Sequence, residues 1–218
     1  MKKKRFSGLT NQTPDRIALD AGAFFIGFDV NSDTYATAKE AGKILGATQG
    51  GGEFSAKANL RQIAVDGSNG RVRGLTDVTD WEVYIKATII ETTVGTIRTA
   101  IAAAKVTAPS GDSSDVPTGY TKIEGKATID DDDYIDNITW VGNISGSDKP
   151  IIIQIKCVLN EDGFKLAPKD GDEAKISVTF YGYNSLNDFV TDTVEPPFAI
   201  YYPDLTPSTP ASYEEEQL

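Results

Sequence analysis

The chain has 218 residues, a formal net charge of −11, no histidine and a single cysteine. The lack of histidine removes the commonest general base and metal ligand, which argues against most enzymes. An acidic surface repels phosphate backbones, so specific nucleic-acid binding is disfavoured as well. The most apolar segments, AFFIGF and IIIQIKCVL, are too short to cross a bilayer, and no apolar run follows the basic start MKKKRF. We therefore expect no membrane role, no signal peptide, no cofactor and no catalytic or metal-binding residues.

The first third of the chain combines a polar start with a glycine-rich segment. Residues 1–15 are polar and charged, and we expect a flexible N-terminal arm there, before a strand within 23–30. Further on, LGATQGGGEFS resembles a phosphate-binding loop only in its glycines, because Glu53 stands where such a loop needs Lys followed by Ser or Thr. We interpret Gly50, Gly51 and Gly52 as a loop that must flex or pack closely against another chain.

Four later segments alternate apolar and polar residues with a period of two, which indicates strands with one buried face. The expected inward residues are Trp81, Val83, Ile85, Ala87 and Ile89; Ile123, Gly125, Ala127 and Ile129; Ile151, Ile153, Ile155, Cys157 and Leu159; and Ala174, Ile176, Val178 and Phe180. Cys157 is thus predicted to be a buried structural thiol. YIDNITWVGNI and PFAIYYPD are weaker strand candidates.

One segment instead has helical spacing. In TTVGTIRTAIAAAK, a threonine that can cap precedes an apolar stripe of Val94, Ile97, Ile101 and Ala104. The sequence therefore predicts a mainly β fold, an antiparallel β-sandwich or barrel of seven or eight strands with one flanking α-helix, in a single domain at 16–203. Residues 204–218 contain prolines and end in acidic residues, which indicates a flexible acidic C-terminal tail.

Two polar clusters remain. The hairpin region VDGSNGRVRG gathers Arg61, Arg71 and Arg73 around its turn, where they are either solvated or paired with carboxylates of another subunit. Asp130, Asp131, Asp132 and Asp133 lack the glycine and terminal glutamate of a calcium-binding loop, so we expect a turn that faces solvent or a lumen.

Carboxylates could also serve a glycosidase. Glu195 or Asp192 could pair with Asp188, but nothing in the sequence singles out one pair. We therefore give this enzymatic interpretation little weight.

Three motifs follow one another between residues 20 and 75. The first is D-A-G, at Asp20, Ala21 and Gly22. The second is G-A-T-x-G-G with a nearby Phe, at Gly46, Ala47, Thr48, Gly50, Gly51 and Phe54. The third is R-x-I-x-x-D-G-x-x-G-x-V-x-G, at Arg61, Ile63, Asp66, Gly67, Gly70, Val72 and Gly74. Together they resemble the N-terminal half of the major tail tube proteins of long, non-contractile-tailed bacteriophages. EAKISVTFYGYNSLNDF and PFAIYYPD are similar to the closing strands of that family.

The resemblance implies a structural virion protein with the phage tail tube fold, made in the host bacterial cytoplasm. Copies would form hexameric rings that stack into a tube, through which the genome is delivered. The implied partners are the chain itself, the tape-measure protein in the lumen, the tail terminator, distal tail or baseplate proteins, and transiting DNA without specific binding. The stacking contacts would involve Gly50, Gly51, Gly52, Phe54, Arg61, Asp66, Gly67, Gly70, Arg71 and Arg73, and Asp130 to Asp133 would line an acidic lumen.

Two alternatives stay open. Tubes of contractile tails and of secretion-type injection systems share the architecture that the resemblance implies. An immunoglobulin-like binding or adhesin module is also compatible with a chain of short strands, although we expect an adhesin to carry a secretion signal.

Overall fold

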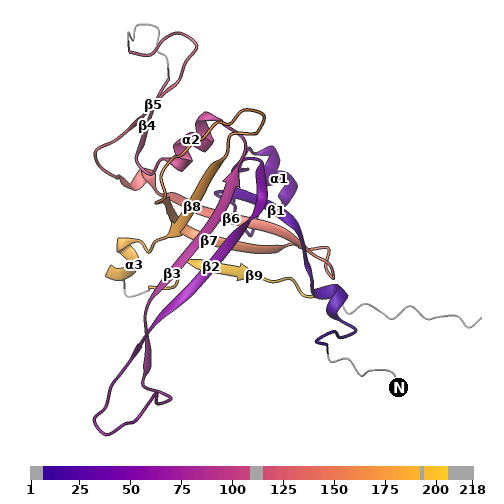
Figure 1. Cartoon of the computed structure of the whole chain (residues 1–218), viewed down its shortest axis with the longest axis vertical. Helices are drawn as coiled ribbons and strands as arrows, with labels where there is room; N and C mark the ends of the chain where they lie inside the picture. Colours follow the sequence, from indigo (N-terminus) through magenta and orange to yellow (C-terminus); the bar gives the residue numbers. More distant parts are fainter. Residues whose placement is uncertain (1–6, 109–114, 192–193, 206–218) are drawn as a thin grey trace, which may run out of the picture.

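The computed structural model describes residues 7–108, 115–191 and 194–205. Within these residues it contains nine strands, three short α-helices and two 3-10 helices (Figure 1). In chain order they are η1 (Thr13–Arg16), β1 (Ala18–Ile26), α1 (Tyr35–Glu40), β2 (Thr48–Gln62), β3 (Thr76–Ile89), α2 (Val94–Ala100), β4 (Ala104–Thr107), β5 (Lys122–Gly125), η2 (Asp131–Asp133), β6 (Ile135–Ile144), β7 (Ile151–Asn160), β8 (Ile176–Gly182), α3 (Leu186–Val190) and β9 (Phe198–Tyr201). No helix in the described residues is long and apolar enough to span a membrane.

Seven of the strands form one antiparallel sheet in the order β1-β6-β7-β8-β3-β2, with β9 paired to β7. The sheet curls into a half-barrel, and β4 and β5 form a separate small sheet (Figure 1). The predicted mainly β, antiparallel class is therefore confirmed, in a curled, barrel-like form. The predicted flanking helix is α2, and two shorter helices accompany it.

The main core fills the concave face of the half-barrel. On β3 and β8 the predicted alternation is confirmed at Val83, Ile85, Ile176, Val178 and Phe180, which are all buried in this core. It is wrong at the start of both segments, because Trp81 is 36% exposed and Ala174 lies before β8. Their burial on a shared face is the main favourable contribution to the fold, about 1.5–3 kcal/mol for each large side chain.

A second, smaller core lies on the outer side of β1. Neighbouring residues Phe24 and Phe25 point to opposite faces of the strand, Phe24 into the main core and Phe25 into a cluster with Phe28, Ala38 and Val141. Ala38 belongs to α1, so this short helix covers the outer cluster.

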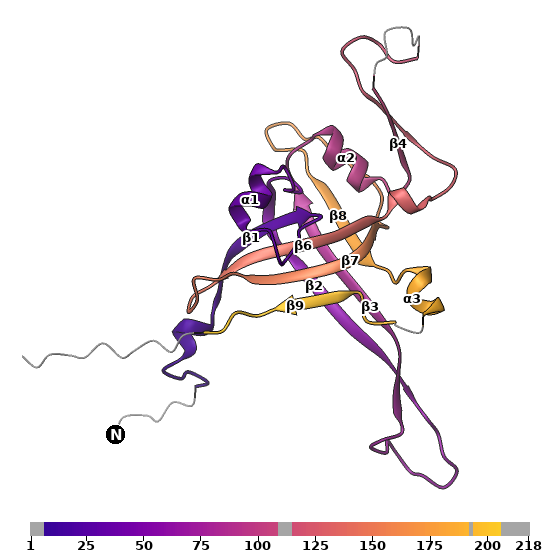
Figure 2. The ribbon, with the colours of Figure 1, turned by 180° about the vertical axis from the view of Figure 1, so that it is seen from behind.

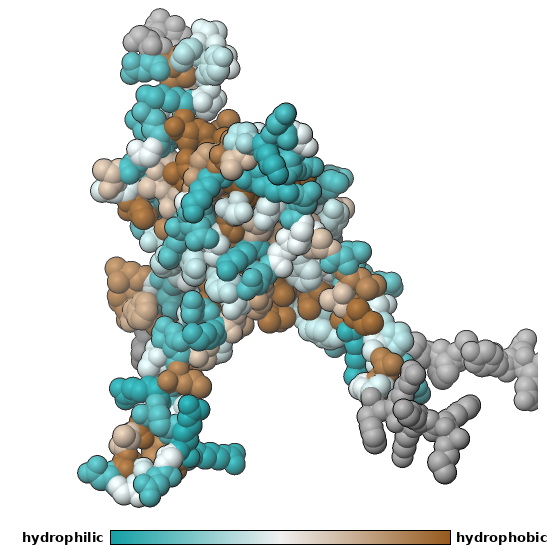
Figure 3. Space-filling view, viewed as in Figure 1, coloured by the Kyte–Doolittle hydropathy of each residue, from teal (hydrophilic) through white to brown (hydrophobic). Residues whose placement is uncertain are grey.

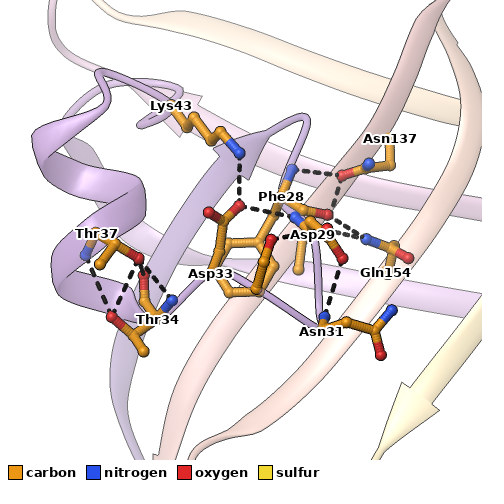
Figure 4. A network of polar contacts seen from close by, with 11 residues as sticks. Phe28, Asp29, Asn31, Asp33, Thr34, Thr37, Lys43, Asn137 and Gln154 are labelled. Atoms are coloured by element: carbon orange, nitrogen blue, oxygen red, sulfur yellow. Dashed lines mark hydrogen bonds and ion pairs between the residues drawn. The ribbon is translucent and has the colours of Figure 1, made fainter.

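A network of hydrogen bonds holds the loop between β1 and α1 against the sheet (Figure 4). The Asn137 side chain accepts from the Phe28 N–H at 3.0 Å, and Gln154 Nε2 donates to the Phe28 carbonyl at 2.9 Å. Lys43 Nζ donates to Asp33 Oδ2 at 2.6 Å, which connects the segments before and after α1. Buried polar groups of β6 and β7 are thus satisfied by the loop that they anchor.

Strand β7 departs from its predicted pattern at Cys157. Its backbone is left-handed there, with φ 49°, and its side chain is half-buried, whereas Val158 is fully buried. Ile155 and Val158, three residues apart, both enter the main core. The predicted inward position of Cys157 is therefore wrong. The cause is a local turn where the partner of β7 changes from β9, at 152–155, to β8, at 158–160.

Helix α2 begins as predicted but buries a different face. Thr93 caps it in a capping box with Thr96, and the helix ends at Ala100. Thr96 and Ala100 are the buried residues of the helix, whereas Val94 is 44% exposed. Of the predicted apolar stripe, Ile97 and Ile101 are partly buried and Ala104 is buried, but Ala104 lies beyond the end of the helix, so the prediction is wrong for Val94 and for the helix end. A threonine tolerates burial here because its hydroxyl donates to the carbonyl oxygen of Glu91 at 3.0 Å.

Asn160 joins the end of α2 to the sheet. Its side chain is 1% exposed, donates to the Ala100 carbonyl at 2.7 Å and accepts from the Thr179 N–H at 2.8 Å. A buried amide that is satisfied on both sides holds α2, β7 and β8 in one arrangement.

The segment TKIEGKATID does not join the main sheet. Only Lys122–Gly125 is a strand, and it pairs with β4 in a small sheet that projects from the body (Figure 1). Ala127 and Ile129 are exposed, so the predicted inward face of this segment is wrong. Alternation alone cannot tell a core strand from a hairpin that has no core to face.

Candidate interaction surfaces

Two hairpins project from the body in opposite directions along its longest axis (Figures 1 and 2). One is the far half of the β2–β3 hairpin, residues 58–80, which we call the β2–β3 arm. The other is formed by β4 and β5. A surface that extends beyond the core at both ends can contact neighbours on both sides along this axis.

The β2–β3 arm exposes apolar side chains that contact no core. Residues 61–74 are all exposed, and the strands of the arm pair only with each other, from Ala58 opposite Trp81 to Gln62 opposite Thr76. The exposed apolar side chains are Leu60, Ile63, Val65, Val72 and Val78. An isolated two-stranded hairpin is marginally stable in water, and apolar side chains that gather on a surface indicate a contact with another molecule.

Six of the ten predicted stacking residues lie together in this arm. Arg61, Arg71 and Arg73 are exposed, and none of the ion pairs among the described residues involves them. Asp66, Gly67 and Gly70 are at the exposed tip, where both glycines have left-handed backbone. Arginines without carboxylate partners can pair bidentately with carboxylates of another chain.

The other four predicted stacking residues lie in the body of the molecule, in strand β2. The prediction of a loop at the three glycines among them is therefore wrong. Gly50 and Gly51 have φ values of 84° and 74° and occupy a shift in the register between β2 and β3. A Cβ atom would meet no neighbour at either glycine. The pattern of glycines indicates a loop, but here it allows a bulge within a paired strand.

Gly52 and Phe54 make their contacts within the chain. A Cβ atom at Gly52 would overlap the Phe24 ring and lie 2.6 Å from the Lys86 carbonyl oxygen. The ring centroid of Phe54 lies 5.8 Å from that of Phe198. Gly52 therefore lets the Phe24 ring of β1 approach β2, across the open side of the half-barrel.

The aspartate cluster is partly neutralised inside the chain. Lys126 Nζ lies 2.6 Å from Asp133 Oδ2 and 2.9 Å from Asp130 Oδ2. The Asp133 side chain is only 5% exposed, and its pKa is lowered because it accepts from the Asp130 N–H and from Lys126. The same contacts raise the pKa of Lys126. Asp131 and Asp132 are exposed, as expected of a solvated turn, whereas Asp133 is not.

The sequence analysis did not predict an exposed apolar surface on helix α3. The one-turn helix α3 exposes Leu186 to 80%, Phe189 to 60% and Val190 to 76%, and these side chains form an apolar patch at the left of Figure 3. The patch borders a hollow of about 970 Å³ beside β6 and β7, where burial raises the pKa of the Cys157 thiol. The apolar spacing i, i+3, i+4 after the capping Ser185 signals this helix in the sequence.

The structure describes only some of the residues that were considered for carboxylate chemistry. Asp188 is engaged in the capping box of α3, and Asp192 lies outside the described residues. In the described parts of the chain, no group of three or more Asp, Glu or Cys side chains is arranged to hold a metal ion.

Comparison with models of protein families finds none that matches the chain, and a search of curated proteins finds no significant match. The function is therefore argued from the surfaces described above.

Proposed function

We propose that this chain is a structural protein that assembles with copies of itself into stacked hexameric rings, the tail tube of a long, non-contractile-tailed bacteriophage. The observation that carries the proposal is the β2–β3 arm, with its exposed apolar side chains and with arginines that form no ion pair among the described residues. Tape-measure, terminator and distal tail proteins follow as partners, and DNA passes through the lumen without specific binding. These further partners rest on the sequence resemblance.

Unpaired strand edges support self-association. β2 is the last strand of the sheet, so among the described strands its fifteen residues pair only with β3. Residues 76–83 of β3 likewise have a partner only on the β2 side. A long free edge promotes pairing with another chain, and in a ring of identical subunits the edge would be covered by a neighbour.

The charge of the chain suits a channel for DNA. With a net charge of −11 and exposed carboxylates at Asp131 and Asp132, a lumen lined by this chain would repel the phosphate backbone. Screening limits the repulsion to roughly 8 Å at physiological salt, so it prevents adhesion to the wall without hindering passage.

The fold favours a tube over an immunoglobulin-like binding module. Immunoglobulin-like domains pack two sheets face to face, whereas the main strands here form one curled sheet. A tube from a contractile or secretion-type system predicts the same self-assembly and differs in its partners.

Negative-stain electron microscopy of the pure protein at rising concentration tests the proposal. We expect hollow tubes from the wild type, and loss of tubes for the Arg71→Glu/Arg73→Glu variant. Lys165→Glu/Lys169→Glu makes the same charge change at exposed positions outside the arm and is the matched control. Wild-type protein that stays monomeric at every concentration would contradict the proposal, and equal tube formation by both variants would contradict the role of the arm.

A further inference from the structure

The predicted stacking residues form two groups at opposite ends of strand β2. One group lies in the β2–β3 arm, and the other surrounds the bulge near the start of the strand. β2 is continuous from Thr48 to Gln62, and from Gly52 to Arg61 it spans about 30 Å at roughly 3.3 Å per residue. The arm therefore cannot reach the bulge of its own chain, and a contact between the two groups needs a second copy.

A small hollow, the β1–β2 hollow, lies where the first and last strands of the sheet approach each other. Both strands shift register beside it, β1 between Leu19 and Ala23 and β2 between Thr48 and Gly52. Strand bulges of this kind often lie next to functional sites. The hollow has a volume of about 280 Å³, which is small for a ligand pocket and suits a single long side chain.

The charged residues that line the β1–β2 hollow are both acidic. They are Asp20 and Glu53, and no ion pair among the described residues involves either of them. Asp20 Oδ2 accepts from the Asn143 amide at 3.3 Å, and Glu53 Oε1 accepts from the Tyr84 hydroxyl at 2.9 Å. Lys86 is opposite Glu53 in the ladder, but its Nζ lies over the Tyr84 ring, 4.6 Å from the centroid. Both carboxylates thus keep acceptor sites for a cation from another molecule.

The aromatic wall of the hollow suits a guanidinium group in particular. Phe54 and Trp140 line it, and both are partly buried. Trp140 Nε1 donates to the Ala21 carbonyl oxygen at 2.8 Å, which orients the indole ring. A planar guanidinium stacks on aromatic rings and donates to carboxylates in a fixed geometry, whereas a lysine ammonium is a point charge. The hollow therefore combines the two features that recognise arginine.

The β2–β3 arm carries arginines that suit such a site. Arg71 and Arg73 lie in its exposed loop, and no ion pair among the described residues involves them. Arg61, in contrast, is opposite Asp77 in the ladder of the arm. The segment 61–74 contains these three arginines and one aspartate, so its charge is opposite in sign to that of the hollow.

We propose that Arg71 and Arg73 of one copy bind in the β1–β2 hollow of the next copy, beside Asp20 and Glu53, and so join consecutive rings. This inference rests on the proposed function. The contact is head-to-tail, and the arm extends from the body on the side away from β1, so its repetition stacks copies along one axis (Figures 1 and 2). The glycine-rich motif and the arginine hairpin are then the two halves of one contact.

Crosslinking with a short bismaleimide tests the contact and leaves all four charged groups in place. In a Cys157→Ala background, Val72→Cys with Ala21→Cys places one thiol on the arm and one at the hollow, too far apart to be linked within a chain. We expect a ladder of linked copies on a denaturing gel. Val72→Cys with Ala36→Cys, which moves the second thiol to an exposed position of α1, is the matched control and should give no ladder.

Removal of the charges of the hollow gives a second test. Asp20→Asn/Glu53→Gln should raise the protein concentration at which tubes appear about tenfold, because two partly exposed ion pairs are lost. Asparagine tolerates the left-handed backbone at Asp20, φ 69°. Asp148→Asn/Asp204→Asn makes the same charge change at exposed positions outside the hollow and should leave the concentration unchanged. Equal effects of the two double variants would overturn the role of the hollow.

The outcomes separate this contact from the proposed function. Tubes without a ladder, or an equal ladder from the Ala36→Cys control, would overturn the contact and leave the tube intact. A ladder from Val72→Cys/Ala21→Cys without tubes would support the contact and contradict the tube, and neither tubes nor ladder would overturn both. Circular dichroism of each variant as dilute monomer is measured first, so that the absence of a ladder reports on the contact and not on folding.

Discussion

Replacing Gly52 by alanine is expected to destabilise the fold through packing and not through backbone strain. Its backbone lies outside the left-handed region that favours glycine, but the added Cβ would overlap the Phe24 ring and lie 2.6 Å from the Lys86 carbonyl oxygen. Because the carbonyl belongs to β3, the strand paired with β2, it cannot move without disturbing the ladder.

Overpacking of this kind costs about 1–3 kcal/mol, and the backbone contact places Gly52→Ala at the upper end, about 2–3 kcal/mol. For a chain of this length the loss corresponds to a fall in melting temperature of about 4–12 °C. Gly51→Ala is the matched control, because its Cβ would meet nothing and only the left-handed backbone, φ 74°, opposes it, at about 1–2 kcal/mol.

Thermal unfolding of dilute monomer, followed by circular dichroism, measures both variants without interference from assembly. Equal or smaller destabilisation by Gly52→Ala than by Gly51→Ala would refute the reasoning. It would mean that Gly52 is not required for the approach of β1 to β2, and its role would then lie in contacts with another chain.

Three other predictions follow from buried or paired groups. Asn160→Ala should lower the free energy of unfolding by about 2–4 kcal/mol in chemical denaturation, because it leaves a buried carbonyl and a buried N–H unsatisfied; a change below 1 kcal/mol would contradict this. The lowered pKa of Asp133 means that its carboxylate stabilises the fold above its ordinary value of 3.8, and that this contribution is lost as the pH falls through the lower folded-state pKa. Acid titration of Asp133→Asn should therefore show a smaller loss of stability below that pH than the wild type shows, and identical titrations would be contrary evidence. The raised pKa of Cys157 should make it react more slowly with a thiol reagent at pH 8 than free cysteine does, and an equal rate would argue against its burial.

The alternation of apolar and polar residues correctly predicts a strand when one of its faces lies over the core and the other does not. The alternation in β3 and β8 is reliable because one face of each strand lies over the main core and the other does not. The same pattern was misleading in β5, which has no core beneath it, and at Cys157, where the backbone turns as one partner strand replaces another. Which strands share a sheet depends on pairings between distant residues, and a single sequence does not encode these locally.

The candidate surfaces were predictable only in part for a related reason. Arg61, Arg71 and Arg73 could be grouped from the sequence because a single hairpin brings them together. The apolar side chains of α3 have the same i, i+3, i+4 spacing as a buried helix face, so their exposure becomes visible only when the packing of the whole chain is known. Phe54 belongs to a recognisable motif and Gly52 directly follows its glycines, but their contacts with Phe24 and Phe198 connect segments far apart in the chain.

A tube needs two independent sets of contacts, one that closes the ring and one that joins rings along the axis. A single head-to-tail contact gives only a ring or a filament, according to whether its rotation closes. In this chain the β2–β3 arm and the β4–β5 hairpin extend along the longest axis, and the exposed apolar side chains of α3 lie to one side of it. Variants of the arm should therefore prevent tubes, and microscopy shows whether single rings remain.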